Sequence, residues 1–299
     1  MTAKQFALAE PARGVLKLTG EDRGIFLQGL VSNDVRLIAP DRAIWAALLT
    51  AQGKYLHDFF IAERGDAWLI EGEGARIADL RRRLGLYKLR AKIAIEDVSA
   101  DWEVAFGWGD GAVASFGLDE AGRAKPAGGG IVFADPRLAE LGIRLIAPNG
   151  TAQPILAGAG LAQGDLAGWD RLRLGLGVPD GTRDLELEKA ILLESGFDEL
   201  NGVAWDKGCY IGQELTARTK YRGLVKKRLM PVELDGAVPA PGTLVMRGQT
   251  EAGEIRSGRD GIALALIRLD ALAAGPLKAG ETEVRPRPPA WLALPDSVV

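Results

Sequence analysis

One short stretch of the sequence, K-G-C-Y-I-G-Q-E, carries the only cysteine of the 299-residue chain, Cys209. Gly208 and Gly212 lie on either side of this thiol, and glycine lets the backbone turn sharply and approach a ligand or a partner closely. Positive charge from Lys207 and Arg218 would favour the thiolate, which is the form of cysteine that acts as a nucleophile or metal ligand. A helix that begins near Gly212 would favour the thiolate too, because its amide end is electropositive.

Two interpretations of Cys209 stay open at this point. A lone free cysteine is most often a small buried apolar residue. The alternative is a functional thiol in an exposed, electropositive setting. The candidate motif as a whole comprises Lys207, Gly208, Cys209, Tyr210, Gly212, Gln213, Glu214 and Arg218.

The residue counts exclude several kinds of site. With one cysteine and one histidine, His57, the chain cannot build a Cys/His zinc site or a four-cysteine iron–sulfur cluster by itself. We therefore expect no metal site within one chain, and a cluster could be bound only through ligands shared between chains. A single imidazole also disfavours a Ser-His-Asp or Cys-His catalytic arrangement.

The composition predicts a soluble globular protein that resides in the cytoplasm. Hydrophobic residues make up 47% and charged residues 26% of the chain, and the net charge of -3 gives no general attraction to nucleic acid or to an anionic membrane. The start, M-T-A-K-Q-F-A, lacks the apolar core of a signal peptide, and no apolar run approaches the length of a membrane span. A single cysteine fits a reducing compartment.

Hydrophobic patterning predicts an α+β fold in three parts. Residues 1–100 alternate like strands at 14–19, 43–49, 55–62 and 67–70, with helices beginning at 20–22 and spanning 74–84. This order predicts an antiparallel sheet with helices packed on one face. Residues 101–225 form a second α+β subdomain, with short strands at 102–106, 113–116, 131–133 and 143–146 and a helix at 166–176. Residues 226–299 alternate at 228–234, 243–246 and 261–267 between Pro- and Gly-rich turns, as in a small β-barrel.

The expected strand at 55–62 carries two neighbouring polar residues on opposite faces. Alternation puts His57 on the face of Phe59 and Ile61, where we expect a buried core histidine. Asp58 belongs to the other face, and a buried carboxylate must be paired or line a polar pocket. We favour the pocket.

Several motifs resemble the YgfZ family of folate-binding proteins, which are related to the T-protein (aminomethyltransferase) of the glycine cleavage system. The K-G-C-Y-I-G-Q-E stretch is highly specific to this family. The other matching motifs are L-T-G-E-D-R at 18–23, F-L-Q-G-L-V-S-N-D-V at 26–35, L-T-A-Q-G-K at 49–54, R-L-G-L-G-V-P-D-G at 173–181 and T-A-R-T at 216–219. The last two look most like the branch that contains the mitochondrial iron–sulfur assembly factor.

The resemblance implies a ring of antiparallel-sheet subdomains with helices, followed by a C-terminal β-barrel. It also implies a tetrahydrofolate-binding accessory factor for the assembly or repair of [4Fe–4S] proteins, with tRNA-modifying enzymes among its clients. Cys209 would be the functional thiol, and the expected partners are folate, iron–sulfur assembly proteins and [4Fe–4S] client enzymes. The folate residues implied are Trp169, Asn33, Asp58 and Glu194.

An alternative implied by the same resemblance is a tetrahydrofolate-dependent one-carbon transferase like the aminomethyltransferase. That enzyme has adjacent aspartates where this chain has His57 and Asp58, and a glutamate where this chain has Gly175. Because methylene transfer needs carboxylates to hold the pterin and manage its protons, these departures favour the accessory factor.

Overall fold

The computed structural model describes residues 2–9, 11–272 and 275–294, which form two compact units. The first unit comprises Met1–Leu48, His57–Trp169 and Asn201–Ile211. The second comprises Leu49–Leu56, Asp170–Leu200 and Gly212–Val299. The division of the chain at residues 100 and 225 stays a prediction.

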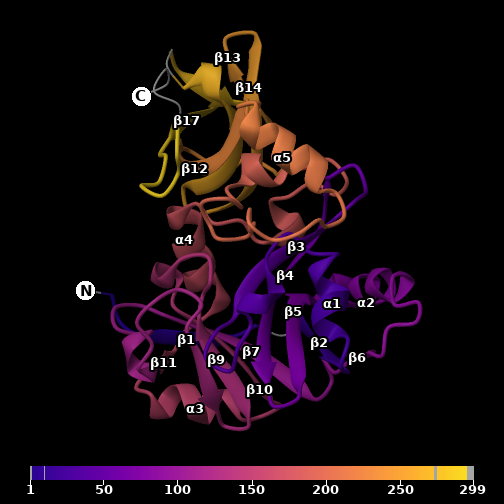
Figure 1. Ribbon diagram of the computed structural model, residues 1–299. Coiled ribbons are helices and arrows are strands. Elements are labelled where there is room, and N and C mark those ends of the chain that lie inside the picture. Colours follow the sequence, from indigo (N-terminus) through magenta and orange to yellow (C-terminus); the bar gives the residue numbers. More distant parts are fainter. Residues whose placement is uncertain (1, 10, 273–274, 295–299) are drawn as a thin grey trace. The chain divides into compact units, whose positions relative to one another are not determined.

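Two sheets dominate the first unit (Figure 1). One sheet has the strand order β3-β4-β5-β2-β6, and its strands are β2 (Arg13–Thr19), β3 (Ile44–Leu49), β4 (Tyr55–Arg64), β5 (Ala67–Glu73) and β6 (Ala94–Asp97). The other has the order β11-β1-β7-β10-β9-β8, and its strands are β1 (Gln5–Leu8), β7 (Trp102–Trp108), β8 (Ala124–Ala127), β9 (Gly130–Ala134), β10 (Ile143–Pro148) and β11 (Ala162–Gln163). The strand pairs whose register is described are antiparallel, except β1 with β11, which run parallel.

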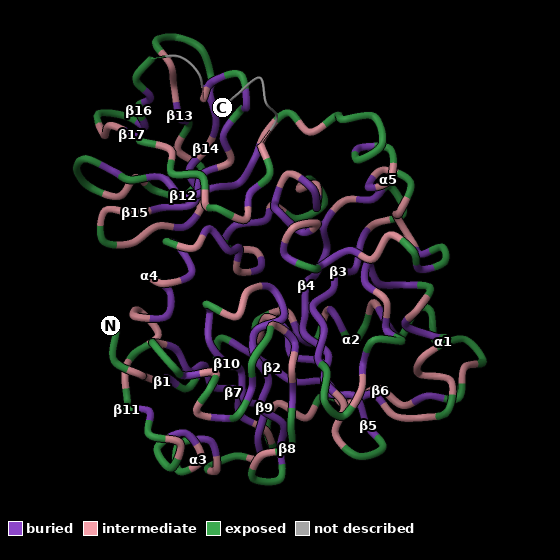
Figure 2. The backbone as a smooth tube through the Cα atoms, turned by 60° about the vertical axis from the view of Figure 1, so that its left-hand side comes forward, coloured by how far each residue is buried: buried purple, intermediate pink, exposed green. Residues whose placement is uncertain are grey.

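Helices cover one face of each sheet. Phe59 and Ile61 of β4 share a hydrophobic core with residues of α1 (Arg23–Gln28) and α2 (Ile77–Leu86). Leu145 of β10 belongs to a second core that includes Leu156 of α3 (Ala152–Gly158). Figure 2 shows that buried backbone runs through these strands. Because side chains alternate along a strand, Phe60 of β4 and Arg144 of β10 belong to the faces turned away from these helices.

Buried charges link those two faces. Arg144 of β10 donates from Nη1 to both carboxylate oxygens of Glu71 on β5, at 2.9 Å each. Its Nε donates to Asp135 at 2.8 Å, and Asp135 also accepts from Arg137. Arg13 of β2 donates to Glu71 at 2.5 Å. Burial alone would raise the pKa of the Asp135 carboxyl, but the guanidinium groups of Arg137 and Arg144 outweigh it and hold that pKa well below its ordinary value.

Aromatic rings surround the same arginine. The Arg144 guanidinium lies 3.7 Å from the ring centre of Phe60 and 4.6 Å from that of Phe106. Phe106 stacks on Trp169, with ring centres 4.3 Å apart, and Phe60 stacks on Trp45 at 6.4 Å. Cation–π contacts gain strength when water is excluded, so these rings stabilise a charge that burial would otherwise disfavour.

The second unit contains a closed six-stranded barrel with the order β12-β15-β14-β13-β16-β17. Its strands are β12 (Lys227–Asp235), β13 (Leu244–Arg247), β14 (Thr250–Arg259), β15 (Ile262–Arg268), β16 (Leu277–Ala279) and β17 (Thr282–Pro286). The predicted strands at 228–234, 243–246 and 261–267 are confirmed by β12, β13 and β15. The α+β class with a C-terminal barrel is therefore confirmed. The remaining helices are α4 (Leu166–Leu176), which matches the predicted helix, and α5 (Gln213–Tyr221).

One predicted strand, at 113–116, is wrong. The chain forms a single 3₁₀ turn there, Ala114–Phe116. Glycines with positive φ precede and end this segment, Gly111 at 80° and Gly117 at 64°. Such φ values bend the backbone away from the extended path that a strand needs.

Candidate functional site

The loop that carries Cys209 is anchored by the lysine that begins the motif. Lys207 is buried, and its Nζ donates to the backbone carbonyls of Val31 at 2.6 Å and Asn33 at 2.7 Å. Burial lowers the pKa of Lys207 to about 8, and the nearby Asp34 carboxylate opposes only part of this effect. A neutral amine still has two N–H groups, which is enough for both carbonyls.

A second anchor follows the cysteine. The backbone N–H of Ile211 donates to the carbonyl of Gly29 at 3.1 Å, and the Ile211 side chain packs against the core under α1. The ring of Tyr210 is buried, with the Lys207 ammonium 5.1 Å from its centre. The backbone is therefore fixed on both sides of Cys209.

Hydrogen bonds of Ser32 also connect the segment around residues 29–33 with the segment that leads to Cys209. Its hydroxyl donates to the carbonyl of Gly202 at 2.6 Å and accepts the backbone N–H of Ala47 at 2.8 Å. Its carbonyl accepts from the backbone N–H of Ala204 at 3.1 Å. The V-S-N stretch at 31–33 therefore fixes, through hydrogen bonds, the segment of the chain that precedes Cys209.

Cys209 itself is exposed and free. The interpretation of this residue as a small buried apolar side chain is therefore wrong. Its role as a functional thiol, and any influence of Lys207 and Arg218 on it, stay predictions. Within the second unit, α5 begins directly after Gly212, which confirms the predicted helix start, and Glu214 and Arg218 are exposed on it.

Gly212 is the motif glycine whose conformation the fold requires. Its φ is 82°, and a Cβ atom placed there would lie 2.4 Å from the carbonyl oxygen of Thr50. Gly53, in the turn before β4, also has a positive φ, and its own Cβ would lie 2.5 Å from the Gly212 carbonyl oxygen. These two glycines let the L-T-A-Q-G-K turn and the start of α5 pack backbone to backbone. Gly208, by contrast, has open space around its Cα.

Asn33 and Asp58, two of the predicted folate residues, meet at Trp45. The Asn33 amide donates to the Trp45 carbonyl at 2.7 Å and to the Asn201 carbonyl at 2.8 Å. The Trp45 indole N–H donates to Asp58 at 3.0 Å. Asn33, Trp45 and Asn201 line a cavity of about 250 Å³ together with apolar residues such as Val203. Asp58 thus lies on the face of β4 opposite to His57, as alternation predicted, where it pairs with Trp45 and is not among the residues that line this cavity.

Sequence reasoning missed Trp45. The available signal was that Trp45 is the only residue of β3 with a polar group in its side chain. The neighbouring strand, β4, carries Asp58. A buried indole N–H needs an acceptor, and Asp58 is a suitable one.

Trp169, the third predicted folate residue, is buried in α4 with only 4% of its surface exposed. Its ring stacks on Phe106, and the Arg144 guanidinium lies 5.7 Å from its centre. Trp169 and Trp45 are thus the two ends of one aromatic and guanidinium stack inside the first unit.

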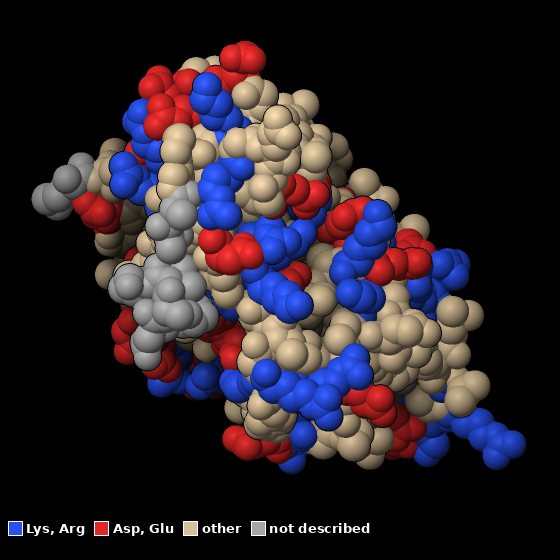
Figure 3. Space-filling model, turned by 90° about the horizontal axis from the view of Figure 1, so that it is seen from above, with Lys and Arg blue, Asp and Glu red and all other residues tan. Residues whose placement is uncertain are grey.

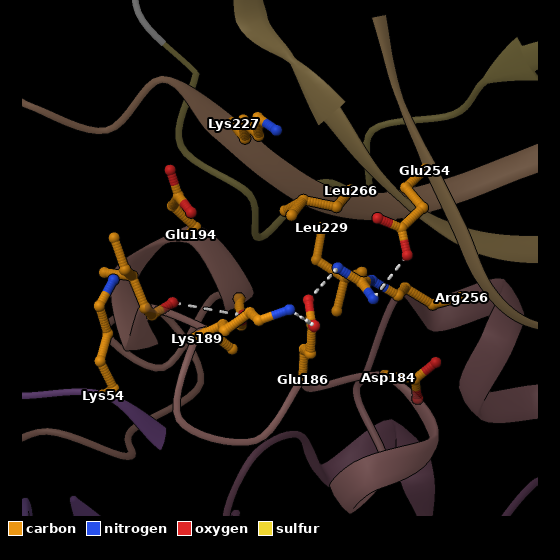
Figure 4. A pocket seen from close by; sticks show the side chains of 13 residues that line it. Lys54, Asp184, Glu186, Lys189, Glu194, Lys227, Leu229, Glu254, Arg256 and Leu266 are labelled. Carbon is orange, nitrogen blue, oxygen red and sulfur yellow. Dashed lines mark hydrogen bonds and ion pairs between the residues drawn. The ribbon is translucent and has the colours of Figure 1, made fainter. Parts of the chain in front are cut away.

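Glu194, the fourth predicted folate residue, lines a cavity of about 260 Å³ in the second unit (Figure 4). Burial raises the pKa of its carboxyl, and the charges of Lys227 and Lys54 oppose part of that effect. The same cavity is lined by Lys189 and Arg256, which sequence reasoning did not single out.

His57 is buried on the helix-covered side of β4, as predicted. Its Nε2 lies 2.9 Å from an Asp79 carboxylate oxygen of α2. Burial and the charge of Arg76 lower the pKa of His57 to about 4, against the opposing effect of Asp79. This imidazole is therefore neutral at physiological pH.

Over the described ranges, no group of three or more His, Cys, Asp or Glu side chains is placed to hold a metal ion. Within the same ranges, no helix has both the length and the apolar character to cross a membrane. Acidic and basic side chains are interspersed on the face seen in Figure 3.

Comparisons with known proteins identify close relatives of this chain. A mouse protein, "Iron-sulfur cluster assembly factor IBA57, mitochondrial", is 33% identical over 294 residues, which cover 91% of this chain and 79% of the mouse protein. The human protein of the same name is 34% identical over 292 residues, with the same two coverages. The family model "CAF17, C-terminal beta-barrel domain" matches residues 226–294.

Among solved structures, the aminomethyltransferase T of the glycine cleavage system from Bartonella henselae has the same fold. The TM-score is 0.77 over 97% of this chain and 86% of that protein, at 13% sequence identity. The predicted T-protein-like fold is confirmed.

The predicted cytoplasmic location is contradicted by these relatives, whose names place them in mitochondria. The physical reason for the error is that a single cysteine indicates only a reducing environment. A reducing environment does not distinguish the cytosol from the mitochondrial matrix.

Replacing Gly212 by alanine tests the glycine contact. A non-glycine residue at positive φ costs about 1–3 kcal/mol, and the overlap with the Thr50 carbonyl oxygen adds to that cost. We expect Gly212→Ala to lower the free energy of unfolding in urea by at least this amount. Gly208→Ala is the matched control, with an expected change within about 0.5 kcal/mol. Equal effects of the two substitutions would contradict the assignment.

The lowered pKa of Lys207 predicts a pH-dependent stability. Between pH 8 and the ordinary lysine value of 10.5, the unfolded chain keeps a proton that the folded chain has lost. The free energy of unfolding of the wild type should therefore rise with pH relative to that of Lys207→Met, by up to about 1.4 kcal/mol per pH unit. Urea denaturation at several pH values from 7.5 to 10 measures this difference. A difference that stays flat or falls over this interval would show that the amine is not desolvated.

Proposed function

The chain belongs to the family of iron–sulfur cluster assembly factors named IBA57, and from this we propose that it is an accessory factor for the assembly or repair of [4Fe–4S] proteins. Cys209 is the functional thiol, and a tetrahydrofolate is the bound cofactor. Its partners are iron–sulfur assembly proteins and [4Fe–4S] client enzymes, with tRNA-modifying enzymes among the clients.

The observation that carries the proposal is an exposed thiol on a loop with a fixed backbone. The anchors at Lys207 and Ile211 hold the chain on both sides of Cys209. Such a loop presents the sulfur to a partner with little loss of conformational freedom, because its backbone is already ordered.

The cysteine count restricts how this thiol acts. Cys209 is the only thiol in the chain, so one copy supplies one sulfur ligand. The [4Fe–4S] clusters are usually held by four thiolates. Any cluster that Cys209 contacts must therefore take its other ligands from a partner, which makes transient contact at a partner's cluster the fitting role.

Cys209→Ser tests the thiol, because it replaces sulfur by oxygen with little change in shape. In a strain that lacks the protein, we expect the variant to restore less than a tenth of the [4Fe–4S] enzyme activity that the wild type restores. Activities of [2Fe–2S] enzymes, measured in parallel, should not depend on either form. Unfolding of the purified variant should match the wild type, since the side chain is exposed. Full restoration by Cys209→Ser would refute the thiol role.

The folate proposal is supported by the cavity beside Trp45. Its lining of apolar residues, an indole, two amides and Arg42 suits a planar ring with hydrogen-bonding edges, and its volume of about 250 Å³ suits the pterin ring alone rather than a whole folate. The Asp58 carboxylate behind the indole fixes its orientation through the N–H group. We propose Asn33, Asp58, Trp169 and Glu194 as folate residues, with Trp45 as an addition.

Titration with tetrahydrofolate, followed by tryptophan fluorescence, tests this cofactor. We expect saturable quenching in the wild type and at least tenfold weaker binding in Asp58→Asn, which keeps the side-chain shape but removes the charge. Asp66→Asn, at an exposed turn, is the matched control and should bind like the wild type. Absence of saturation at millimolar ligand would eliminate the folate role and leave a pure interaction protein.

The one-carbon transferase is the alternative, and the shared fold is the observation in its favour. His57 weighs against it, because this imidazole is buried against Asp79 on the helix-covered side of β4 and does not replace a carboxylate beside Asp58. Incubation with an aminomethyl donor and tetrahydrofolate distinguishes the one-carbon transferase from the accessory factor. Formation of methylene-tetrahydrofolate at catalytic rates would establish the enzyme.

A further inference from the structure

The cavity around Glu194 has a distinctive balance of charges. Its lining includes four basic residues and four acidic residues: Lys54, Lys189, Lys227, Arg256, Asp184, Glu186, Glu194 and Glu254. Most of these charges already neutralise one another. Glu186 pairs with Lys189 and Arg256, and Glu254 pairs with Arg256 at 2.8 Å (Figure 4).

Asp184 is also occupied by hydrogen bonds within the protein. It accepts from Arg173 at 2.7 Å and from the Ser257 hydroxyl at 2.5 Å. Three charged groups of the lining then remain for a ligand, namely Lys54, Lys227 and Glu194. The Glu194 carboxylate also accepts hydrogen bonds from the backbone of Lys226 and Lys227, which leaves its other lone pairs for a ligand. Lys227 has only a loose pair with Glu251, at 3.7 Å on the surface. Within the described residues, the side chain of Lys54 has no hydrogen bond or ion pair.

Lys54, Glu194 and Lys227 belong to three different segments of the second unit, and the fold holds the backbone of each segment in place. Lys54 directly precedes β4, whose first residue, Tyr55, exchanges backbone hydrogen bonds with Glu188 and Ala190. Glu194 lies in the 3₁₀ helix Leu192–Ser195, and Lys227 is the first residue of β12.

A buried arginine joins the last two elements. Arg228, which follows Lys227, donates from its guanidinium to the carbonyl of Leu193, which precedes Glu194. The backbone at the two lysines and the glutamate is thus held in place by buried or backbone contacts, as a preformed site requires.

From this arrangement we propose that the cavity binds a free dicarboxylic α-amino acid of the glutamate or aspartate class. Two carboxylates of the ligand pair with Lys54 and Lys227, and its ammonium group donates to Glu194. The ligand's charge of -1 complements the +1 that these three residues carry together. Its methylene groups pack on Leu229 and Leu266, which also line the cavity.

The size of the cavity supports a ligand of this class. A volume of about 260 Å³ lies below the range of about 300–1,000 Å³ that is usual for drug-sized molecules. It holds on the order of nine water molecules at liquid density, which leaves room for a molecule of about ten non-hydrogen atoms. The same dicarboxylate chemistry occurs in a glutamyl group at the end of a larger ligand, but there the nitrogen is an uncharged amide. The ammonium group therefore distinguishes the two sources.

Isothermal titration calorimetry of the full chain tests the site with L-glutamate, L-aspartate, glutarate and N-acetyl-L-glutamate as probes. We expect one of the two amino acids to bind saturably at one site per chain. Lys54→Met and Lys227→Met should each weaken binding at least tenfold, because each removes a charge-assisted hydrogen bond. Lys226→Met is the matched control, an exposed neighbour that does not line the cavity, and should bind like the wild type.

The role of Glu194 has its own readout. Glutarate lacks the ammonium group, so it should bind more weakly than L-glutamate to the wild type, and Glu194→Gln should abolish this preference. No saturable heat up to about 10 mM amino acid, which corresponds to binding too weak for a specific site, would overturn the proposal. So would equal binding by the lysine variants and Lys226→Met. Binding of N-acetyl-L-glutamate as tight as that of L-glutamate would assign the cavity to a glutamyl group instead.

The experiment shares one residue with the proposed function, Glu194, and amino-acid binding in this cavity would remove Glu194 from the proposed folate residues. It uses neither tetrahydrofolate nor an iron–sulfur enzyme, so its failure would leave the roles of Cys209 and Asp58 untouched.

Discussion

The contact between Arg144 and Glu71 is the constraint on which the first unit depends. It places an ion pair with almost no solvent exposure between two sheets whose other faces are already covered by helices. Loss of one partner from such a pair costs about 3–5 kcal/mol, because the other charge is left buried and uncompensated. The positions of Phe60, Phe106 and Trp169 follow from this contact, since their rings pack against the same guanidinium. The folate proposal therefore concerns a region whose geometry is set by charge as much as by apolar packing.

Local patterns in the sequence were enough to predict the elements but not this contact. Alternation placed His57 and Asp58 on opposite faces of β4, and apolar spacing predicted α4 with its observed bounds. Glu71 and Arg144, however, are 73 positions apart, and each is a charged residue in a largely apolar strand, which is equally compatible with a surface position. Pairing at that separation depends on tertiary packing, about which local periodicity carries no information.

The motif around Cys209 also shows that sequence patterns predict local structure but not contacts between distant residues. Its glycines and lysine suggested a sharply turned, exposed and electropositive setting for the sulfur. The structure instead gives Lys207 a positional role, since its amine reaches carbonyls 176 and 174 residues earlier in the chain. Sequence reasoning predicted the start of α5, whereas the partners of Lys207 and Gly212 could be learned only from the fold. A motif residue with a reactive side chain can thus serve to fix the backbone of its loop.

The exposure of Cys209 also has a consequence for oxidation. A chain with one thiol cannot form an internal disulfide, so any disulfide that Cys209 forms joins it to a thiol of another molecule. Every covalent product of that kind has a fixed stoichiometry of one bond per chain. A disulfide at Cys209 is therefore always a covalent link between this chain and another molecule, whether glutathione, a second copy or a partner.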